Sequence, residues 1–536
     1  MSKKILYTTV IFAWMFLLSS CERDKDFILP GPKLNTLFES QNSFVQEPGN
    51  DVILEFELEA TSGIQSFEVF RNDAIFETAD EFVGEISANY LFDYEIPTDE
   101  DIGTTTSFSV LLIDAEGREA GYDFNIVSGS TFTETVENIN GTEVIRVKGR
   151  VNGDYSFLEQ NTYVVDSTFS IENNGNLTIE AGSTVYFKTY PDETTSRLVI
   201  TRGSTINAVG TAENPIVFTS DKLLTGDTPQ ADDWGGLFIY GNAPTNQGSV
   251  ILEDGFRYGG SATNESSGTL SYIRVEHAGK SGLHGIHLFG VGAGTQVNHI
   301  QVFNNENIAF RLKGGGVNLK YISAIKHGGY GLWAEHGWQG YGQFWIFQTD
   351  RQATLVPVNF WNQARSIEFR NDEAFFLTEP RTEFVVSNVT LIGNGDAEGT
   401  ENGTRRGVRI RRGAFGIFQN AIVTEFPDDA VRVEDLDVEE LGNEMILDNV
   451  HAFNNRVNYN EDAESFFFNS GNFNLSEQPV PGINIDNFVG SLPSSFNPTS
   501  VSSWFENAPY IGAVENAGSD WTAEGNWFKN LDGTIR

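Results

Sequence analysis

The sequence predicts an all-β protein, with an N-terminal immunoglobulin-like β-sandwich followed by a right-handed parallel β-helix. Three observations predict this fold class: apolar strands of three to five residues, turns of Gly, Asn and Asp between them, and a repeat of roughly 20 to 30 residues. The intervals between these strands leave no room for a crossover helix. Short strands that recur at this spacing are typical of a solenoid whose rungs stack on one shared core.

The repeat is clearest in the middle of the chain. Ile273, Ile300 and Ile322 lie 27 and 22 residues apart, and Ile286 precedes Ile308 by 22 residues. We therefore expect these residues to occupy equivalent positions on successive rungs. The predicted β-helix covers residues 131–536 and includes two end caps, because a terminal rung must shield the open core. The N-terminal cap is expected at 145–151 and 163–171, and the C-terminal cap at 510–513 and 521–527.

Residues 33–128 are predicted to form the sandwich. In Val52–Glu59, apolar residues alternate with mostly acidic ones, the pattern of a half-buried strand. Similar runs occur at 67–70, 108–113 and 121–127, and Asp114–Gly117 is a turn signal that joins the last two as a hairpin. We expect this domain to act as a spacer without chemistry of its own.

The N-terminus is predicted to carry a lipid. Residues 1–20 have two lysines, an apolar run and small residues before Cys21, the pattern of a lipoprotein signal peptide. Cys21 is the single cysteine of the chain and is the expected acylation site, which would attach the protein to outer-membrane lipid. Residues 21–32 then form the anchor and tether, with Pro30-Gly31-Pro32 stiffening its end.

The charge of the chain limits its partners. The sequence has 34 basic and 74 acidic residues and a net charge of −40. So acidic a surface repels phosphate backbones, which makes nucleic acid a poor candidate ligand. With one cysteine, which is expected to be acylated, the chain has no intrachain disulfide and no thiolate metal site or catalytic thiol.

Several motifs carry a resemblance to a known family. They are L-x-I-x-A-G and G-T-A-x-x-P-I-x-F-T-S within Leu177–Ser220, D-W-G-G-L at 233–237, G-N-A-P at 241–244, S-N-V-T-L-I-G at 387–393 and Y-I-G-A at 510–513. Together, over about residues 145–530, they resemble the β-helix surface lipoproteins of Bacteroidota. The resemblance implies a protein on the outer face of the outer membrane, beside TonB-dependent, SusC/SusD-like uptake systems. The acidic stretch Glu22–Asp26 resembles the export tag of such lipoproteins, although a solvated linker would look the same.

The chain departs from this family at two turns. Relatives carry paired aspartates where this chain has Asn305-Glu306-Asn307 and His327-Gly328-Gly329. A Ca²⁺ ion takes about six to eight oxygen ligands, so Ca²⁺ binding is not carried over from the resemblance. We predict no cofactor.

Six of the seven histidines are clustered in sequence, and the set is His277, His284, His287, His299, His327 and His336. Because His284 and His287 are three apart on an expected strand, they are predicted to point to opposite faces and to share no metal ion. A histidine ladder across adjacent rungs stays an alternative. We favour ordinary surface and turn positions and predict no metal site.

The first candidate binding group is aromatic. It comprises Tyr330, Trp333, Trp338, Tyr341 and Trp345, interleaved with glycines. Exposed rings of this kind stack on sugars or anchor a partner protein. Because the resembling family also has G-W-x-G-x-x-Q-F here, stacking inside the rungs is the alternative for some of these rings.

The second candidate binding group is basic. Arg409 and Arg411 share one face of an expected strand within Arg405–Gly413 while Ile410 points inward. A β-helix polysaccharide lyase uses Ca²⁺ to neutralise a uronate and an Arg or Lys as base, so these residues are candidates for ligand binding. The favoured interpretation is structural pairing with carboxylates such as Asp428, Asp429 and Glu434 one turn later.

These observations favour a non-catalytic cell-surface lipoprotein, a binding or accessory module of a TonB-dependent transport complex with a glycan or peptide ligand. A second hypothesis is a β-helix polysaccharide lyase or glycoside hydrolase, because this fold hosts both roles. The third is a structural or assembly subunit of an outer-membrane complex. No catalytic residue is predicted, since sequence alone does not single out a carboxylate pair among 74 acids.

Overall fold

The structure is a computed structural model. It describes residues 29–36, 42–101, 103–129, 132–252, 254–350, 365–395, 406–435, 445–460 and 473–536. Cys21, the signal peptide and most of the tether lie outside the described residues. The chain divides into two compact units, residues 1–129 and 130–536. Within the described ranges, no helix has the length and apolar character needed to cross a membrane.

The first unit is a β-sandwich. One sheet has the order β1-β3-β6 and the other β2-β8-β7-β4-β5, and all pairs are antiparallel except β2 with β8. Rings from both sheets meet in one core, for example Phe92 of β6 and Phe124 of β8 at 5.1 Å between centroids. The strands and the short helix are β1 Lys33–Thr36, β2 Ser43–Gln46, β3 Asp51–Glu59, β4 Ile64–Arg71, β5 Ala74–Thr78, η1 Asp80–Phe82, β6 Ser87–Glu95, β7 Thr105–Asp114 and β8 Glu119–Ser128.

The alternation in Val52–Glu59 explains this sandwich. Val52, Leu54, Phe56 and Leu58 are buried, while the residues between them stay half-buried or exposed. The predicted hairpin is present, since β7 and β8 pair antiparallel around the turn at 115–118. The two-sheet architecture is therefore the one that the sequence predicts.

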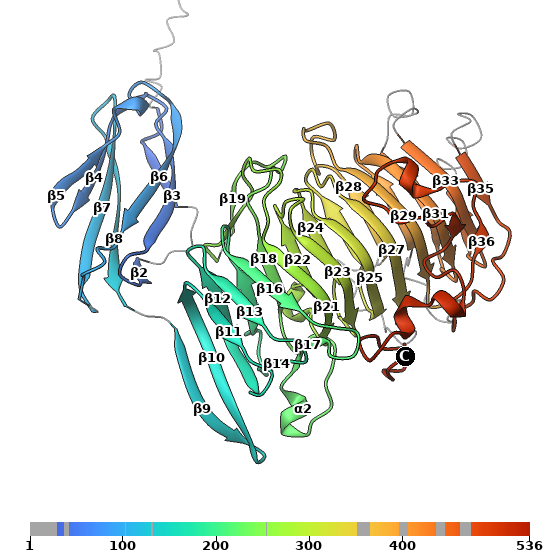
Figure 1. Cartoon of the computed structure of the whole chain (residues 1–536). Coiled ribbons are helices and arrows are strands. Elements are labelled where there is room, and N and C mark those ends of the chain that lie inside the picture. The colour runs from blue at the N-terminus through green and yellow to red at the C-terminus, as the bar shows by residue number, and fades with distance from the viewer. Residues whose placement is uncertain are drawn as a thin grey trace, which may run out of the picture. The chain divides into compact units, whose positions relative to one another are not determined.

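The second unit is a parallel β-helix, as predicted (Figure 1). Its first strands are β9 Thr133–Ile139, β10 Thr142–Asn152, β11 Tyr155–Phe157, β12 Tyr163–Glu172, β13 Asn176–Ile179, β14 Thr184–Phe187, β15 Arg197–Ile200, β16 Thr205–Val209, β17 Ile216–Ser220, β18 Gly236–Tyr240, β19 Val250–Ile251, β20 Arg257–Tyr258, β21 Gly268–Glu276, β22 Ile286–Phe289 and β23 Gln296–Phe303. The later strands are β24 Phe310–Lys313, β25 Asn318–His327, β26 Leu332–Glu335, β27 Tyr341–Thr349, β28 Arg365–Arg370, β29 Glu383–Ile392, β30 Arg406–Arg411, β31 Phe415–Thr424, β32 Asp429–Glu434, β33 Met445–Phe453, β34 Val457–Tyr459, β35 Phe473–Ser476, β36 Leu492–Pro493 and β37 Tyr510–Ile511. The helices are α2 Lys222–Thr225, η2 Lys280–Gly282, η3 Pro498–Ser500, η4 Ala517–Ser519 and η5 Trp521–Ala523.

Register confirms most of the predicted repeat. Ile273 pairs with Ile300, and Ile300 with Ile322, so these residues stack in the core on successive rungs. The partner of Ile286 is Phe310 and not the predicted Ile308. The strand begins two residues later than the spacing suggested, because the turn before β24 (304–309) is two residues longer than the turn before β26 (328–331).

Long strands bend between two sheets at a left-handed residue. The corner positions on successive rungs have φ near +55° and are occupied by Tyr272, His299, Tyr321, Phe344, Asn388, Asn420 and Asn449. Such a φ costs a non-glycine residue about 1–2 kcal/mol. Stacking of the side chains offsets part of this cost. The rings of Tyr272, His299, Tyr321 and Phe344 stack one on the next, with neighbouring ring centroids 4.3 to 4.7 Å apart.

The ends of the solenoid differ from the predicted caps. β10 and β12 belong to the parallel stack, and the strand that closes the N-terminal side is β9, which pairs antiparallel with β10. The C-terminal segment after β35 runs back along the corner. The Asn388 side-chain amide donates to the Tyr510 carbonyl at 2.7 Å, Arg274 donates to the Trp527 carbonyl at 3.0 Å, and the backbone N–H of Asn526 donates to the Ala212 carbonyl at 2.6 Å. The predicted C-terminal cap is therefore a cover for the side of the solenoid.

Candidate functional site

The candidate site is the face of the sheet built by β22, β24, β26, β28, β30 and β32 that points away from the solenoid core, and most of its side chains are buried. Each strand is short and alternates, as in Phe310-Arg311-Leu312-Lys313 of β24, so successive side chains point inward and outward in turn. Parallel register aligns the outward residues in two columns. We call this surface the charged face. The first column is His287, Arg311, Trp333, Glu368, Arg409 and Arg432, and the second is Phe289, Lys313, Glu335, Arg370, Arg411 and Glu434.

Glu335 binds two arginines in the part of the charged face formed by β24, β26 and β28. Its carboxylate accepts hydrogen bonds from both Arg311 and Arg370 and is 1% exposed. Burial alone would raise the pKa of the Glu335 carboxyl, but the two guanidinium groups outweigh it and hold this pKa well below its usual value. The same two arginines lie over the Trp333 ring, at 4.0 and 4.3 Å from its centre. These contacts fix all four side chains.

Glu368 and Glu434 bind arginines in the part formed by β28, β30 and β32. Arg365 and Arg411 bind Glu368, the latter at 3.0 Å, and Arg409 lies 3.9 Å from the same carboxylate. Glu434 binds Arg409 directly and lies 3.7 Å from Arg411. The predicted pairing of Arg409 and Arg411 with carboxylates one turn later is therefore present through Glu434.

The other two predicted partners bind different arginines. Asp428 lies 3.1 Å from Arg406, and Asp429 lies 3.2 Å from Arg406 and 2.6 Å from Arg432. Glu368, which the sequence pattern did not predict as a partner, is shared by Arg365, Arg409 and Arg411. Each arginine in the two columns thus has a carboxylate within ion-pair distance.

Lys313 is different from these arginines. Among the residues that the structure describes, it has no hydrogen-bond or ion-pair partner, and its Nζ lies 4.9 Å from the centre of the Phe289 ring. Burial, together with Arg311, lowers the pKa of Lys313 to about 8. A cation that is largely removed from water and lacks an anion is a natural attachment point for an acidic ligand group.

The predicted aromatic group does not form one surface. Trp338 and Trp345 are buried in the core, where their Nε1 atoms donate to the carbonyls of Val317 and Leu319 at 3.2 and 2.9 Å. Tyr330 is also buried, with the Arg365 guanidinium 5.0 Å from its ring. The binding role predicted for these three rings is wrong. Trp338 and Trp345 lie in the core, and Tyr330 is covered by neighbouring residues.

The other two predicted rings lie on different sides of the solenoid. Trp333 belongs to the charged face and is half-buried between its two arginines. Tyr341 is half-buried against Trp504 and Phe505 of the C-terminal segment, at 5.8 and 5.3 Å between ring centres. Of the five predicted aromatic residues, Trp333 alone contributes to the charged face.

The histidines are also placed differently from the prediction. His284 precedes β22, so its ring stacks on that of His287 at 4.6 Å, and its backbone N–H donates to His287 Nε2 at 3.0 Å. The prediction that these two point to opposite faces is therefore wrong. Burial lowers the pKa of both well below the usual range. In the described part of the chain, no three His, Cys, Asp or Glu side chains come together as a metal site.

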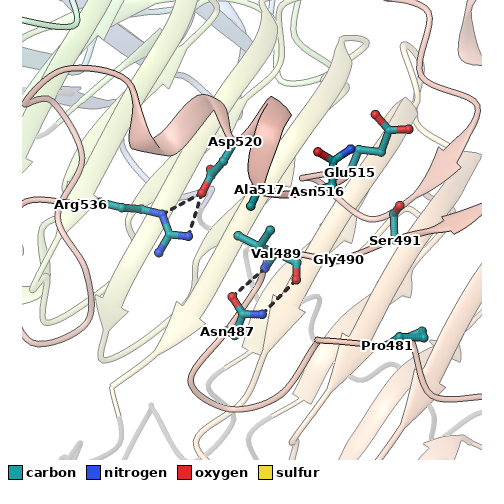
Figure 2. Close-up of a pocket in the computed structure, with 10 residues that line it drawn as sticks. All are labelled: Pro481, Asn487, Val489, Gly490, Ser491, Glu515, Asn516, Ala517, Asp520 and Arg536. Carbon is teal, nitrogen blue, oxygen red and sulfur yellow. Dashed lines mark hydrogen bonds and ion pairs between the residues drawn. The ribbon is translucent and has the colours of Figure 1, made fainter.

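A hollow in the C-terminal segment is a second candidate site (Figure 2). It has a volume of about 580 Å³ and is lined by Pro481, Asn487, Val489, Gly490, Ser491, Glu515, Asn516, Ala517, Asp520 and Arg536. Arg536 and Asp520 point toward each other across it and form an ion pair at 2.8 Å. The charged face also offers Lys313, whose ammonium group has no ion-pair partner among the described residues, so it is the stronger candidate site.

Missed residues of the charged face carry a common signal in the sequence. Arg311, Lys313, Glu335, Glu368 and Arg370 all occupy the outward positions of four-residue alternations such as F-R-L-K, L-W-A-E and I-E-F-R. Charged residues between inward apolar ones, repeated on consecutive rungs, indicate a charged column on a solenoid face. Reading the alternation in every rung would have found them.

Residues 149–478 match the pectate-lyase-like β-helix domain, which is more than half of the chain, so the chain belongs to this family of parallel β-helix proteins. No curated protein sequence matches the chain. Among solved structures, pectate lyase Pel3 from Pectobacterium carotovorum is similar over 75% of this chain and 89% of its own, at 8% identity and a TM-score of 0.11. A TM-score this low carries no functional argument.

Proposed function

We propose that the chain is a non-catalytic cell-surface lipoprotein, which serves as a binding or accessory module of an outer-membrane TonB-dependent, SusC/SusD-like transport complex. The lipoprotein signal with Cys21, the acidic composition and the resemblance to Bacteroidota surface lipoproteins support the location. Lipid attachment would hold the β-helix at the membrane, and the sandwich unit would serve as a spacer.

The observation that carries the binding role is the internal compensation of the charged face. Each arginine in the two columns is held by the chain's own carboxylates, with Glu335, Glu368 and Glu434 as the shared partners. These contacts restrict the side chains before any ligand arrives. A preorganised surface loses little conformational entropy on binding, which favours recognition of a ligand.

Lys313 is the proposed contact for an acidic group on that ligand. Its ammonium group has no ion-pair partner among the described residues, and the Phe289 ring beside it offers an apolar surface. A glycan or peptide that carries a carboxylate fits this combination, because the carboxylate would pair with Lys313 while a sugar or side-chain face packs on the ring.

A binding assay tests this proposal. Full-length wild-type protein and the Lys313→Met variant are each titrated with acidic oligosaccharides and acidic peptides, and their affinities are compared. Loss of a charge-assisted contact predicts a decrease in affinity of about tenfold or more. Lys148→Met is the matched control, because Lys148 is exposed on β10. Unchanged binding by Lys313→Met would remove Lys313 from the proposal.

One observation favours a second function, an acidic-polysaccharide lyase. With a pKa of about 8, Lys313 is partly neutral near physiological pH. A neutral amine would take the proton α to a uronate carboxyl, and the electron pair would expel the glycosidic oxygen to leave an unsaturated sugar. Formation of unsaturated products from uronate polymers, lost in Lys313→Met, would establish this function in place of the binding role.

A further inference from the structure

The loop between β28 and β29 has three consecutive exposed apolar residues in its middle. Phe375 is 75% exposed, Phe376 36% and Leu377 56%. We call these three residues the apolar tip. Single exposed apolar residues are ordinary on protein surfaces. In the described part of the solenoid unit, however, no other segment places even two large exposed apolar residues in succession.

Polar side chains hold the backbone of the apolar tip. Asp372 Oδ1 accepts the N–H groups of Ala374 and Phe375 at 2.8 and 2.7 Å. The Asn371 amide donates to the carbonyls of Phe376 and Thr378, each at 2.9 Å. These bonds fix the loop without any help from the apolar side chains, which are left free to make other contacts.

Two distant segments hold the base of the loop. In the loop between β18 and β19, the Asn246 amide donates to Asn371 Oδ1 at 2.8 Å, and the Gln247 amide donates to Asp372 Oδ2 at 2.7 Å. On the other side, Gly413 lies directly against the Phe376 carbonyl, where a Cβ would overlap that oxygen. Three segments of the chain thus hold an apolar tip in solvent in one fixed position.

The charges around the tip decide between possible occupants. Glu379 is exposed, Glu373 pairs with Arg412 at 2.9 Å while its side chain stays 69% exposed, and the whole chain has a net charge of −40. Anionic lipid headgroups would repel such a surface. Rigid aromatic and aliphatic side chains in a fixed arrangement are instead the typical anchors of protein interfaces, because little entropy is lost when they enter a pocket.

We propose that the apolar tip docks into an apolar pocket, rimmed by basic side chains, on a protein partner of this chain. The basic rim would pair with Glu373 and Glu379. The proposal rests on the proposed function in that the partner is the outer-membrane transport protein. A standard interface buries about 800 Å² on each side, so the tip acts as an anchor within a larger contact.

The test compares three variants of the tagged full-length protein purified from detergent-solubilised native outer membranes. Phe375→Ser with Leu377→Ser removes the tip, and Asp372→Ala keeps the apolar side chains but releases the loop. Val136→Ser with Leu223→Ser is the control, because those residues are exposed on β9 and α2 of the same unit. Loss of two anchor side chains predicts about tenfold less co-purified barrel protein, Asp372→Ala an intermediate loss, and the control no change.

A photo-crosslinking amino acid at position 375 locates the contact. The proposal expects crosslinked peptides from one apolar pocket of the barrel protein, abolished by excess wild-type protein but not by the Phe375→Ser, Leu377→Ser variant. If the barrel protein co-purifies equally with the wild type and with the Phe375→Ser, Leu377→Ser variant, the docking role is overturned while the proposed function stands. If no barrel co-purifies with the wild type, both fail.

Two further measurements address the other occupants. Binding to vesicles of zwitterionic phosphatidylcholine that the tip variant loses would overturn the proposal in favour of a lipid surface. A concentration-dependent dimer that the tip variant loses in sedimentation would overturn it in favour of a second copy of this chain. Because Phe375, Leu377, Val136 and Leu223 are exposed, the tip variant and the control are expected to melt at the wild-type temperature, which thermal unfolding verifies.

Discussion

Glu335 is the side chain whose charge the charged face needs most. It is 1% exposed and accepts hydrogen bonds from Arg311 and Arg370, both of which are buried. Glu335→Gln keeps the shape but removes the carboxylate that pairs with Arg311 and leaves Arg370 only the exposed Glu373, at 3.8 Å. Removing one partner of a buried ion pair costs about 3–5 kcal/mol, and we expect a loss in this range. Urea unfolding at pH 7 measures it as a lower midpoint.

The pH dependence of this loss follows from the pKa of Glu335. Because the arginines hold that pKa below the usual value of 4.5, the ionised form stabilises the fold at neutral pH. This contribution is present above about pH 4.5 and is lost as the pH falls toward the lowered pKa. The difference in the free energy of unfolding between wild type and Glu335→Gln should therefore become smaller in acid.

A matched control separates burial from charge. Glu373 also pairs with an arginine, Arg412 at 2.9 Å, but its side chain is 69% exposed. Glu373→Gln is expected to cost less than about 1 kcal/mol, because water screens an exposed pair. Equal midpoints for Glu335→Gln and Glu373→Gln, or a gap that does not change with pH, would refute the reasoning.

Three further predictions concern the core, two glycines at positive φ and one histidine. Trp345→Ala leaves a cavity beside the Leu319 carbonyl and should cost about 3–5 kcal/mol, whereas Trp333→Ala loses two cation–π contacts and should cost about 1–2 kcal/mol, as urea unfolding would report. Gly416→Ala should destabilise strongly in thermal unfolding because its Cβ would overlap a β29 carbonyl, while Gly226→Ala, also at positive φ but with open space around it, should cost about 1–2 kcal/mol. Burial lowers the pKa of His299 to about 4, so stability should fall as the pH drops from about 6.5 to 4, and His299→Phe, which keeps the stack, should flatten that part of a stability-against-pH curve.

Local patterns in the sequence predict the architecture well. Alternation in Val52–Glu59 and the spacing of Ile273, Ile300 and Ile322 depend on short-range geometry, and the structure has both the sandwich strand and the stacked core they predict. The partner of Ile286 was missed because turn length between rungs varies, so a fixed spacing does not give the register.

The site was harder to predict because it depends on which rungs are neighbours. Arg409 and Glu368 lie 41 residues apart in sequence but on adjacent strands, since the chain between β28 and β30 includes a whole rung. Trp338 and Trp345 were misjudged because a glycine-rich aromatic run looks alike on either face. The C-terminal segment was misjudged because its contacts, such as that of Trp527 with Arg274, join residues about half the chain apart.

If this β-helix works as a module of an outer-membrane transport complex, it should leave the membrane bound to its partner. Native mass spectrometry of the tagged protein, released from outer membranes in mild detergent, measures this. We expect a complex whose mass equals the acylated chain plus a TonB-dependent barrel protein in fixed stoichiometry. A chain that appears alone, with intact lipid on Cys21, would contradict it.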